Sequence, residues 1–306
     1  MTRPNYRPWP FLFAIPLALL VAAPAVPAEL VPDPPHDCEW CSGWGQPREP
    51  FRIFGNTWYV GGGVSSVLIT TPKGHVLIDG GLTQTAPQIA ANIAKLGFRL
   101  EDVKVIVNSH THYDHAGGIA ALQRASDASI AASEKASRAL AGGGPTEDDP
   151  QFGFGPAHNN FPPVAKVRVI ADGDKITLGG VEITAHYTPG HTPGGTSWTW
   201  KSCENGRCLD MVYADSLNSV SAPDFKFSAV PGRVTEFEKS IDTVAGFACD
   251  ILITPHPEAF DVDAKLASRA AGAKVNPFID PNACKAYAAG ARERLAKRVK
   301  EELPPH

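Results

Sequence analysis

Three histidines and one aspartate fall within the six-residue segment HTHYDH. The run VKVIV at 103–107, in which four residues are apolar and β-branched, ends two residues before this segment and predicts a buried strand. Side chains alternate along extended backbone, so His110 and His112 point the same way and can chelate one metal ion. Asp114 and His115 follow where the chain turns, and they can reach a second ion beside the first. Neutral imidazole and carboxylate suit zinc, with bonds of about 2.0 to 2.2 Å.

Two more histidines follow predicted strands further along the chain. His191 lies in the segment TPGHTPGG after 181–187, and His256 lies in TPHP after 251–254. A single histidine in such a place is more often an ordinary polar residue than a ligand. A polar loop with scattered histidines is likewise the alternative for the first cluster. Together the three segments favour a metal site.

The composition is that of a globular protein with a sizeable core. The 306 residues are 43% hydrophobic and 20% charged, enough for one large domain or two small ones. The formal charge is -4, and no basic stripe with interleaved aromatic residues occurs, which argues against a nucleic-acid partner. Since no large apolar surface stripe is evident, we expect a monomer with no stable membrane partner.

Residues 1–28 have the pattern of a cleaved signal peptide. Arg3 and Arg7 form a positive n-region, an apolar stretch with Pro16 inside it follows, and VPA precedes Glu29. An uncleaved anchor is the alternative, but the apolar stretch is short for a membrane span. We therefore expect an exported, periplasmic protein. Without Arg3 and Arg7 it would carry 26 basic and 32 acidic residues, a net charge of -6.

Export favours disulfide bonds among the six cysteines. Cys203 and Cys208 flank the segment ENGR, in which Asn-Gly is a strong hairpin signal, and the resulting register places the two cysteines opposite each other.

Cys249 and Cys284 would close a loop of about 36 residues, which stabilises by roughly 3 to 4 kcal/mol in the loop-entropy model. Cys38 and Cys41 form a lone C-x-x-C, for which a local disulfide is preferred over a zinc site.

The remaining sequence predicts a mixed α/β domain over 51–306, preceded by a proline-rich arm at 29–50. Residues 142–163, rich in glycine, proline and aromatic residues, are expected to form a long loop that serves as a lid or simply packs on the surface. The expected helices lie at 87–96, from 117, within 130–140 and at 282–302, the last with a solvated face of Lys and Arg. The expected strands lie at 53–60, 65–71, 75–79, 103–107, 130 onward, 167–170, 175–178, 181–187, 196–200, 211–214 and 251–254.

Two halves of this pattern resemble each other. In each, one strand ends in an aspartate, Asp79 or Asp215, and a later strand ends in a histidine, His110 or His256. The repetition predicts two β/α halves stacked sheet to sheet, with helices outside and the reactive groups at one edge.

The pattern H-x-H-x-D-H with a later P-G-H-T-P-G and a strand-end histidine resembles the metallo-β-lactamase superfamily, and YADSL and ITPH are similar to class B β-lactamases of subclass 3. The resemblance covers nearly all of 51–306. It implies an αβ/βα sandwich of two mixed β-sheets, the Cys249–Cys284 bridge, and an Asp79 that orients the histidine loop without binding metal. It also implies two zinc ions, one held by His110, His112 and His191, the other by Asp114, His115 and His256.

The resemblance further implies hydrolysis of the β-lactam amide bond of penicillins, cephalosporins and carbapenems. Two ions about 3.5 to 4 Å apart share a water whose pKa falls toward 7, and the resulting metal-bound hydroxide attacks the carbonyl. Asp114 is expected to steer that hydroxide. Ser216 and Asn218 are expected to bind the substrate, although relatives commonly have Ser or Thr where Asn218 stands.

The same metal ligands serve lactonases and thioester hydrolases that resemble glyoxalase II. In those enzymes a strand-end aspartate bridges the two ions, and Asp215 could do so here. An exported dizinc lactonase or thioesterase is therefore the alternative function. A non-catalytic metal-binding or nucleic-acid-processing protein is a remote third. The position of Asp215 relative to the ligands separates the first two.

Overall fold

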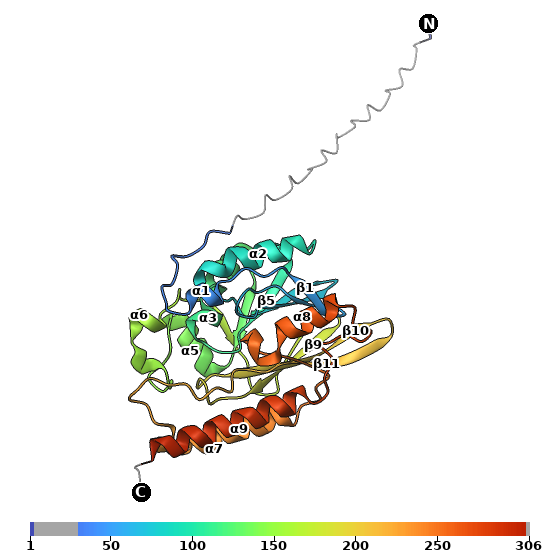
Figure 1. Ribbon diagram of the computed structural model, residues 1–306. Coiled ribbons are helices and arrows are strands. Elements are labelled where there is room, and N and C mark those ends of the chain that lie inside the picture. The colour runs from blue at the N-terminus through green and yellow to red at the C-terminus, as the bar shows by residue number, and fades with distance from the viewer. Residues whose placement is uncertain (3–29, 304–306) are drawn as a thin grey trace.

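Two mixed β-sheets pack face to face in the computed structural model, and helices cover their outer sides (Figure 1). The structure describes residues 1–2 and 30–303, so nearly all of the predicted signal peptide lies outside the described residues. Among the described residues, no helix is long and apolar enough to cross a membrane. The predicted αβ/βα sandwich is confirmed.

The first sheet has seven strands in chain order. Its first four strands are antiparallel, whereas β4 to β7 run parallel. The strands are β1 (Phe51–Phe54), β2 (Thr57–Tyr59), β3 (Val67–Thr71), β4 (Gly74–Ile78), β5 (Val103–Val107), β6 (Ser129–Ala132) and β7 (Val167–Val169).

The second sheet has five strands in the order β12-β11-β10-β9-β8. All neighbours are antiparallel except β11 and β12, which are parallel. The strands are β8 (Lys175–Leu178), β9 (Val181–Tyr187), β10 (Thr196–Glu204), β11 (Arg207–Tyr213) and β12 (Ile251–Ile253).

Strand side chains divide the core into two parts. In β4, Val76 and Ile78 belong to the core between the sheets, whereas Leu77 belongs to the core under the outer helices. Successive residues of a strand point to opposite faces, so a strand buried on both faces must be apolar throughout. That is why the central strands could be recognised as short apolar runs.

Helices α2, α4 and α5 cover the first sheet, and α7 and α9 pack together over the second (Figure 1). The α-helices are α1 (Cys41–Trp44), α2 (Ala86–Lys95), α3 (Tyr113–Ala116), α4 (Ile119–Ser126), α5 (Glu134–Gly142), α6 (Pro156–Asn159), α7 (Arg233–Ala245), α8 (Val262–Ala270) and α9 (Ala283–Glu302). Short 3-10 helices are η1 (Thr83–Thr85), η2 (Leu100–Asp102), η3 (Phe152–Phe154), η4 (Phe227–Ala229) and η5 (Pro257–Phe260).

Two expectations about these elements were wrong. The strand expected at 53–60 is a hairpin of β1 and β2, because Gly55 takes a left-handed φ of 51° and turns the chain. The segment 142–163 is not purely a loop, since it contains η3 and α6. The helices α7 and α8 were also not predicted.

All three predicted disulfide bonds are present. Cys203 and Cys208 face each other in the β10–β11 hairpin, in the predicted register. Cys249 and Cys284 join the segment before β12 to the start of α9. The third bond closes the short C-x-x-C of the arm. The second bridge therefore ties the last helix to the strand that leads to His256.

The predicted similarity of the two halves is visible in the strand pairing. The strand before Asp79 pairs in parallel with the strand before His110, as β4 with β5. The strand before Asp215 likewise pairs in parallel with the strand before His256, as β11 with β12. Parallel neighbours end at the same edge, so all four residues reach one end of the sandwich.

Candidate metal centre

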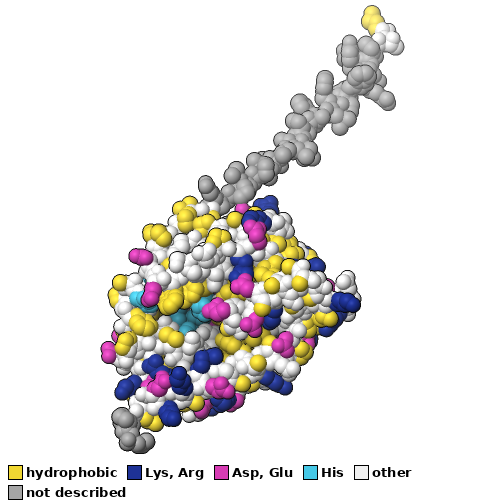
Figure 2. All heavy atoms as spheres, viewed as in Figure 1, with side chains coloured by type: hydrophobic (Ala, Val, Ile, Leu, Met, Phe, Trp, Pro, Cys, Tyr) yellow, Lys and Arg dark blue, Asp and Glu magenta, His cyan; other side chains and the backbone are white. Residues whose placement is uncertain are grey.

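All six predicted metal ligands meet at that end of the sandwich. His110 and His112 follow β5, Asp114 and His115 lie on α3, and the remaining two follow β9 and β12. Figure 2 shows histidine side chains in a hollow on this face, bordered by hydrophobic side chains. Short segments after buried strands therefore carry every one of these ligands.

One group consists of three buried histidines whose ligand atoms lie within 4.8 Å of one another, namely His110, His112 and His191. In each of these histidines, one of the two ring nitrogens already has a hydrogen-bond partner. His110 Nδ1 lies 2.8 Å from Asp215 Oδ1, His112 Nε2 lies 3.2 Å from Asp149 Oδ1, and His191 Nδ1 lies 2.7 Å from the main-chain oxygen of Asn218. These contacts fix each ring, so the other nitrogen is free to bind a cation.

Burial favours the neutral form of two of these rings. The pKa of His110 lies well below its ordinary value because of burial and the neighbouring histidines. The pKa of His191 is also lowered, first by burial and then by His112. Metal binding requires a neutral imidazole, so no proton has to be displaced from these rings at neutral pH.

The other three ligands form a tight triangle. His115 Nε2 lies 2.9 Å from Asp114 Oδ2, His256 Nε2 lies 3.4 Å from the same oxygen, and the two nitrogens are 3.3 Å apart. Ligands of a tetrahedral ion with bonds near 2.0 to 2.1 Å are separated by about 3.3 to 3.4 Å. Although burial alone would raise it, His115 and His256 hold the pKa of Asp114 below its ordinary value. The carboxylate is thus ionised, as a metal ligand must be.

The site therefore fits two divalent cations. His110 Nε2 is buried and has no hydrogen-bond partner among the described residues, a costly arrangement that a bound ion would satisfy. Three imidazoles in one group, and a carboxylate with two imidazoles in the other, match the donors that zinc prefers.

Asp79 lies beneath the histidine loop and does not belong to either group of ligands. It is fully buried and accepts four hydrogen bonds. Asn108 Nδ2 and Ser109 N donate to Oδ1 at 2.9 and 2.7 Å, and Ser109 Oγ and the Tyr213 hydroxyl donate to Oδ2 at 2.6 and 2.7 Å. Asp79 thus joins β11 of one sheet to the loop that carries the ligands.

Asp215 lies behind His110 rather than beside the metal-facing nitrogens. Its Oδ1 contacts His110 Nδ1, and its Oδ2 points at Gly195, where an added Cβ would lie 2.4 Å away. Asp215 is fully buried and does not line the cavity in front of the ligands. In this arrangement the aspartate orients a ligand and does not bridge two ions.

A cavity of about 580 Å³ opens in front of the ligands. Ser216 and Asn218, which are expected to bind substrate, line it, and Trp40, Trp44 and Phe154 add aromatic surface. Phe154 belongs to the segment 142–163, and the arm supplies both tryptophans. Arm and segment therefore form part of the wall around the site.

Several contributing residues were not identified from the sequence. Asp149 comes from a segment without periodicity, and the oxygen of Asn218 belongs to the main chain, so neither has a residue-type signal. Tyr287 was assigned only to the apolar line of the last helix. Its hydroxyl donates to Asp215 O and accepts from Leu217 N, both at 3.1 Å, and so holds the loop on either side of Ser216.

Replacing Tyr287 with phenylalanine should loosen this loop while leaving the metal ligands in place. We expect KM for a substrate that contacts Ser216 to rise about threefold, and the free energy of unfolding to fall by about 1 kcal/mol, because two hydrogen bonds are lost. Steady-state kinetics and urea unfolding of Tyr287→Phe would measure both. A loss of stability with unchanged KM would mean that Tyr287 has only a structural role.

Comparison with known proteins identifies the family. The family model described as the metallo-beta-lactamase superfamily matches residues 59–256. The solved structure of the Rm3 metallo-beta-lactamase is 52% identical with a TM-score of 0.83, over 87% of this chain and 99% of that one. MEM-A1, a subclass B3 metallo-beta-lactamase isolated from a soil metagenome library, is 50% identical with a TM-score of 0.81, over 85% and 98%.

Curated relatives are more distant. The N-acyl homoserine lactonase AttM of Azorhizobium caulinodans is 29% identical over 53% of this chain and 70% of its own length. A probable metallo-hydrolase of Burkholderia pseudomallei is 32% identical over 42% of this chain, and the chain spans 40% of that relative's length. The match over 59–256 and the agreement with the solved structures both show that this chain belongs to the metallo-beta-lactamase superfamily.

Proposed function

We propose that the chain is an exported zinc-dependent β-lactamase that hydrolyses the amide bond of penicillins, cephalosporins and carbapenems. The position of Asp215 carries the proposal against a lactonase, since this carboxylate contacts His110 Nδ1 at 2.8 Å instead of facing the ligand atoms. The likeness to MEM-A1, a subclass B3 enzyme, supports the same choice.

The described residues divide into those that would hold metal and those that would meet substrate. His110, His112 and His191 would hold one zinc ion, and Asp114, His115 and His256 the other. When bound, the ions would supply Lewis-acid chemistry, which polarises a carbonyl and lowers the pKa of an attacking water.

The substrate would be positioned by the walls of the cavity. Ser216 and Asn218 offer a hydroxyl and an amide at its edge, and Trp44 and Phe154 offer apolar contacts that exclude water. Asp114 has one carboxylate oxygen, Oδ2, directed at His115 and His256, and its charge would orient the attacking water. Because water can attack directly in such a site, no serine nucleophile is required.

The decisive experiment is hydrolysis of a carbapenem by protein isolated from the periplasmic fraction, whose first residue should be Glu29. We expect turnover that falls by at least about a thousandfold after treatment with a chelator, because Lewis-acid catalysis contributes several kcal/mol. Re-addition of zinc should restore it, with two zinc ions per chain by elemental analysis. Turnover that resists removal of bound metal would contradict the proposal.

An N-acyl homoserine lactone, assayed in parallel, tests the alternative. The similarity to AttM is the observation that favours it. Turnover of the lactone without turnover of any β-lactam would make the chain an exported lactonase.

A further inference from the structure

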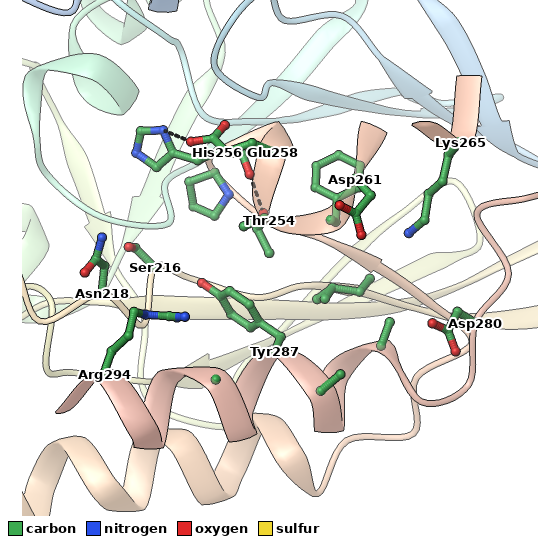
Figure 3. A pocket seen from close by; sticks show the side chains of 17 residues that line it. Ser216, Asn218, Thr254, His256, Glu258, Asp261, Lys265, Asp280, Tyr287 and Arg294 are labelled. Atoms are coloured by element: carbon green, nitrogen blue, oxygen red, sulfur yellow. Dashed lines mark hydrogen bonds and ion pairs between the residues drawn. The ribbon is translucent and has the colours of Figure 1, made fainter. Parts of the chain in front are cut away.

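A second cavity, of about 530 Å³, adjoins the one in front of the metal ligands. Both are lined by Ser216, Asn218, His256 and Glu258, so they form one continuous cleft. The second part extends between the strand-end segment that holds His256 and the helix α9 (Figure 3). A substrate at the metal ligands can therefore extend into it.

The two parts of the cleft differ in charge. In the described part of the chain, no lysine or arginine lines the first part of the cleft, which carries the carboxylates of Glu39 and Glu258 beside Asp114. The second part is lined by two cations, Lys265 and Arg294, together with the carboxylates of Glu258, Asp261 and Asp280. Apart from the zinc ions that the first part would hold, the cationic groups able to attract an anionic group of a substrate are therefore the side chains of the second part.

Of the two cations, Arg294 is the one available to bind an anionic group of a substrate. Lys265 lies 5.7 and 5.8 Å from the ring centres of Phe260 and Phe278, on the part of the cleft that Asp261 and Asp280 line. Within residues 30–303, Arg294 has no carboxylate within 4.0 Å. Its guanidinium group lies beside Tyr287, on the side of the cleft that carries Ser216 and Asn218 (Figure 3).

A glycine one turn earlier makes room for this side chain. Helical side chains lean toward the N-terminus of their helix, so Arg294 lies over position 290. A Cβ atom added at Gly290 would lie 3.2 Å from Arg294 Nη1, which is closer than an ordinary contact. Glycine within a helix costs about 1 kcal/mol relative to alanine. Here it lets the guanidinium lie against the helix and line the cleft.

We propose that Arg294 binds the carboxylate of the β-lactam substrate and so determines specificity for anionic substrates. This inference rests on the proposed function. Guanidinium forms two parallel hydrogen bonds with a carboxylate, and the amide of Asn218 is a further donor at the same end of the cleft. The positive charge on α9 thereby compensates for the amide that stands at 218.

The test compares a bicyclic β-lactam that carries a free carboxylate with its methyl ester, using zinc-loaded protein. For Arg294→Ala we expect KM for the acid to rise about five- to tenfold and KM for the ester to change less than about twofold, because Arg294 is exposed and the pairing partly screened. Arg294→Lys should restore part of the affinity. Equal changes for acid and ester, or none for either, would overturn the proposal.

Two further variants on α9 sharpen the result. Arg292 is also exposed but pairs with Asp242 of α7, so Arg292→Ala should leave both values of KM unchanged. Gly290→Ala keeps the charge but crowds the guanidinium. It should raise KM for the acid alone while raising the melting temperature, because alanine favours the helix. A rise in melting temperature with no change in KM would show that the position of Arg294 is unimportant.

The outcome for Arg294 can be separated from that for the catalytic function. Turnover of the acid by the wild-type protein tests the function, whereas the contrast between acid and ester tests Arg294. Should the wild type not hydrolyse the acid, calorimetric titration of acid and ester into the wild type and Arg294→Ala measures the same contrast as a ratio of Kd values. Equal Kd values for acid and ester in the wild type would overturn the inference.

Discussion

Replacing His191 with alanine should lower β-lactam turnover by at least about a thousandfold, with little loss of folding. His191 follows β9 at the rim of the sandwich, and within residues 30–303 its Nδ1 has a single hydrogen-bond partner, the main-chain oxygen of Asn218. Removing it leaves two of the three histidines in its group, so bound zinc should fall from two ions to about one. The His191 ring is buried and neutral, but it does not belong to the hydrophobic core. Its removal should therefore change the free energy of unfolding of the metal-free protein by less than about 1 kcal/mol.

His186 offers the matched control. It lies on β9, the strand that precedes His191, and its Nε2 contacts Thr199 Oγ1 at 2.8 Å, away from the ligands. His186→Ala should therefore keep two zinc ions and nearly full turnover. Wild-type turnover by His191→Ala, measured beside this control, would contradict the assignment of His191 as a ligand. A collapse of the near-UV circular dichroism in that variant would instead show that its ring supports the fold.

The residues that could be predicted are those whose chemical type indicates a role and whose place follows from the sequence pattern directly beside them. His110 and His112 stand after the run VKVIV, whose four β-branched apolar residues predict both a strand and the edge where it ends. Cys203 and Cys208 stand on either side of an Asn-Gly turn, which predicts their register. In each case a local rule determines the placement.

The features that were not predicted are of two kinds: some depend on contacts between distant segments, and others follow local rules. Asp149 reaches His112 across 37 positions from a segment with no periodic pattern. The hairpin at Gly55 was not predicted, although Gly55 and Asn56 form a two-residue turn signal between two β-rich runs, so a local rule could have predicted it. The helix α7 does show an apolar spacing, at Val234, Phe237 and Ile241, so that helix could have been predicted from the same periodicity rule.

Replacing Asp79 with alanine is the second change for which we expect a large effect, on stability as well as on activity. Asp79→Ala would leave four buried donors without their acceptor, one of them the Tyr213 hydroxyl from the other sheet. Asp79 also has a left-handed φ of 61°, which alanine tolerates poorly. Together these predict a loss of about 4 kcal/mol in the free energy of unfolding, measured by urea denaturation. Turnover should fall as well, because the loop that carries His110 loses its anchor.

Two milder replacements separate the causes. Asp79→Asn keeps an acceptor at Oδ1 for Asn108 and Ser109 and tolerates the left-handed backbone, so it should lose only about 1 to 2 kcal/mol. Asp79→Gly relieves the backbone but restores no acceptor, so it should be only slightly more stable than Asp79→Ala. If glycine instead matched asparagine, backbone strain rather than the hydrogen bonds would explain the loss. Asparagine as harmful as alanine would mean that the negative charge at this position, and not its capacity to accept hydrogen bonds, holds the histidine loop.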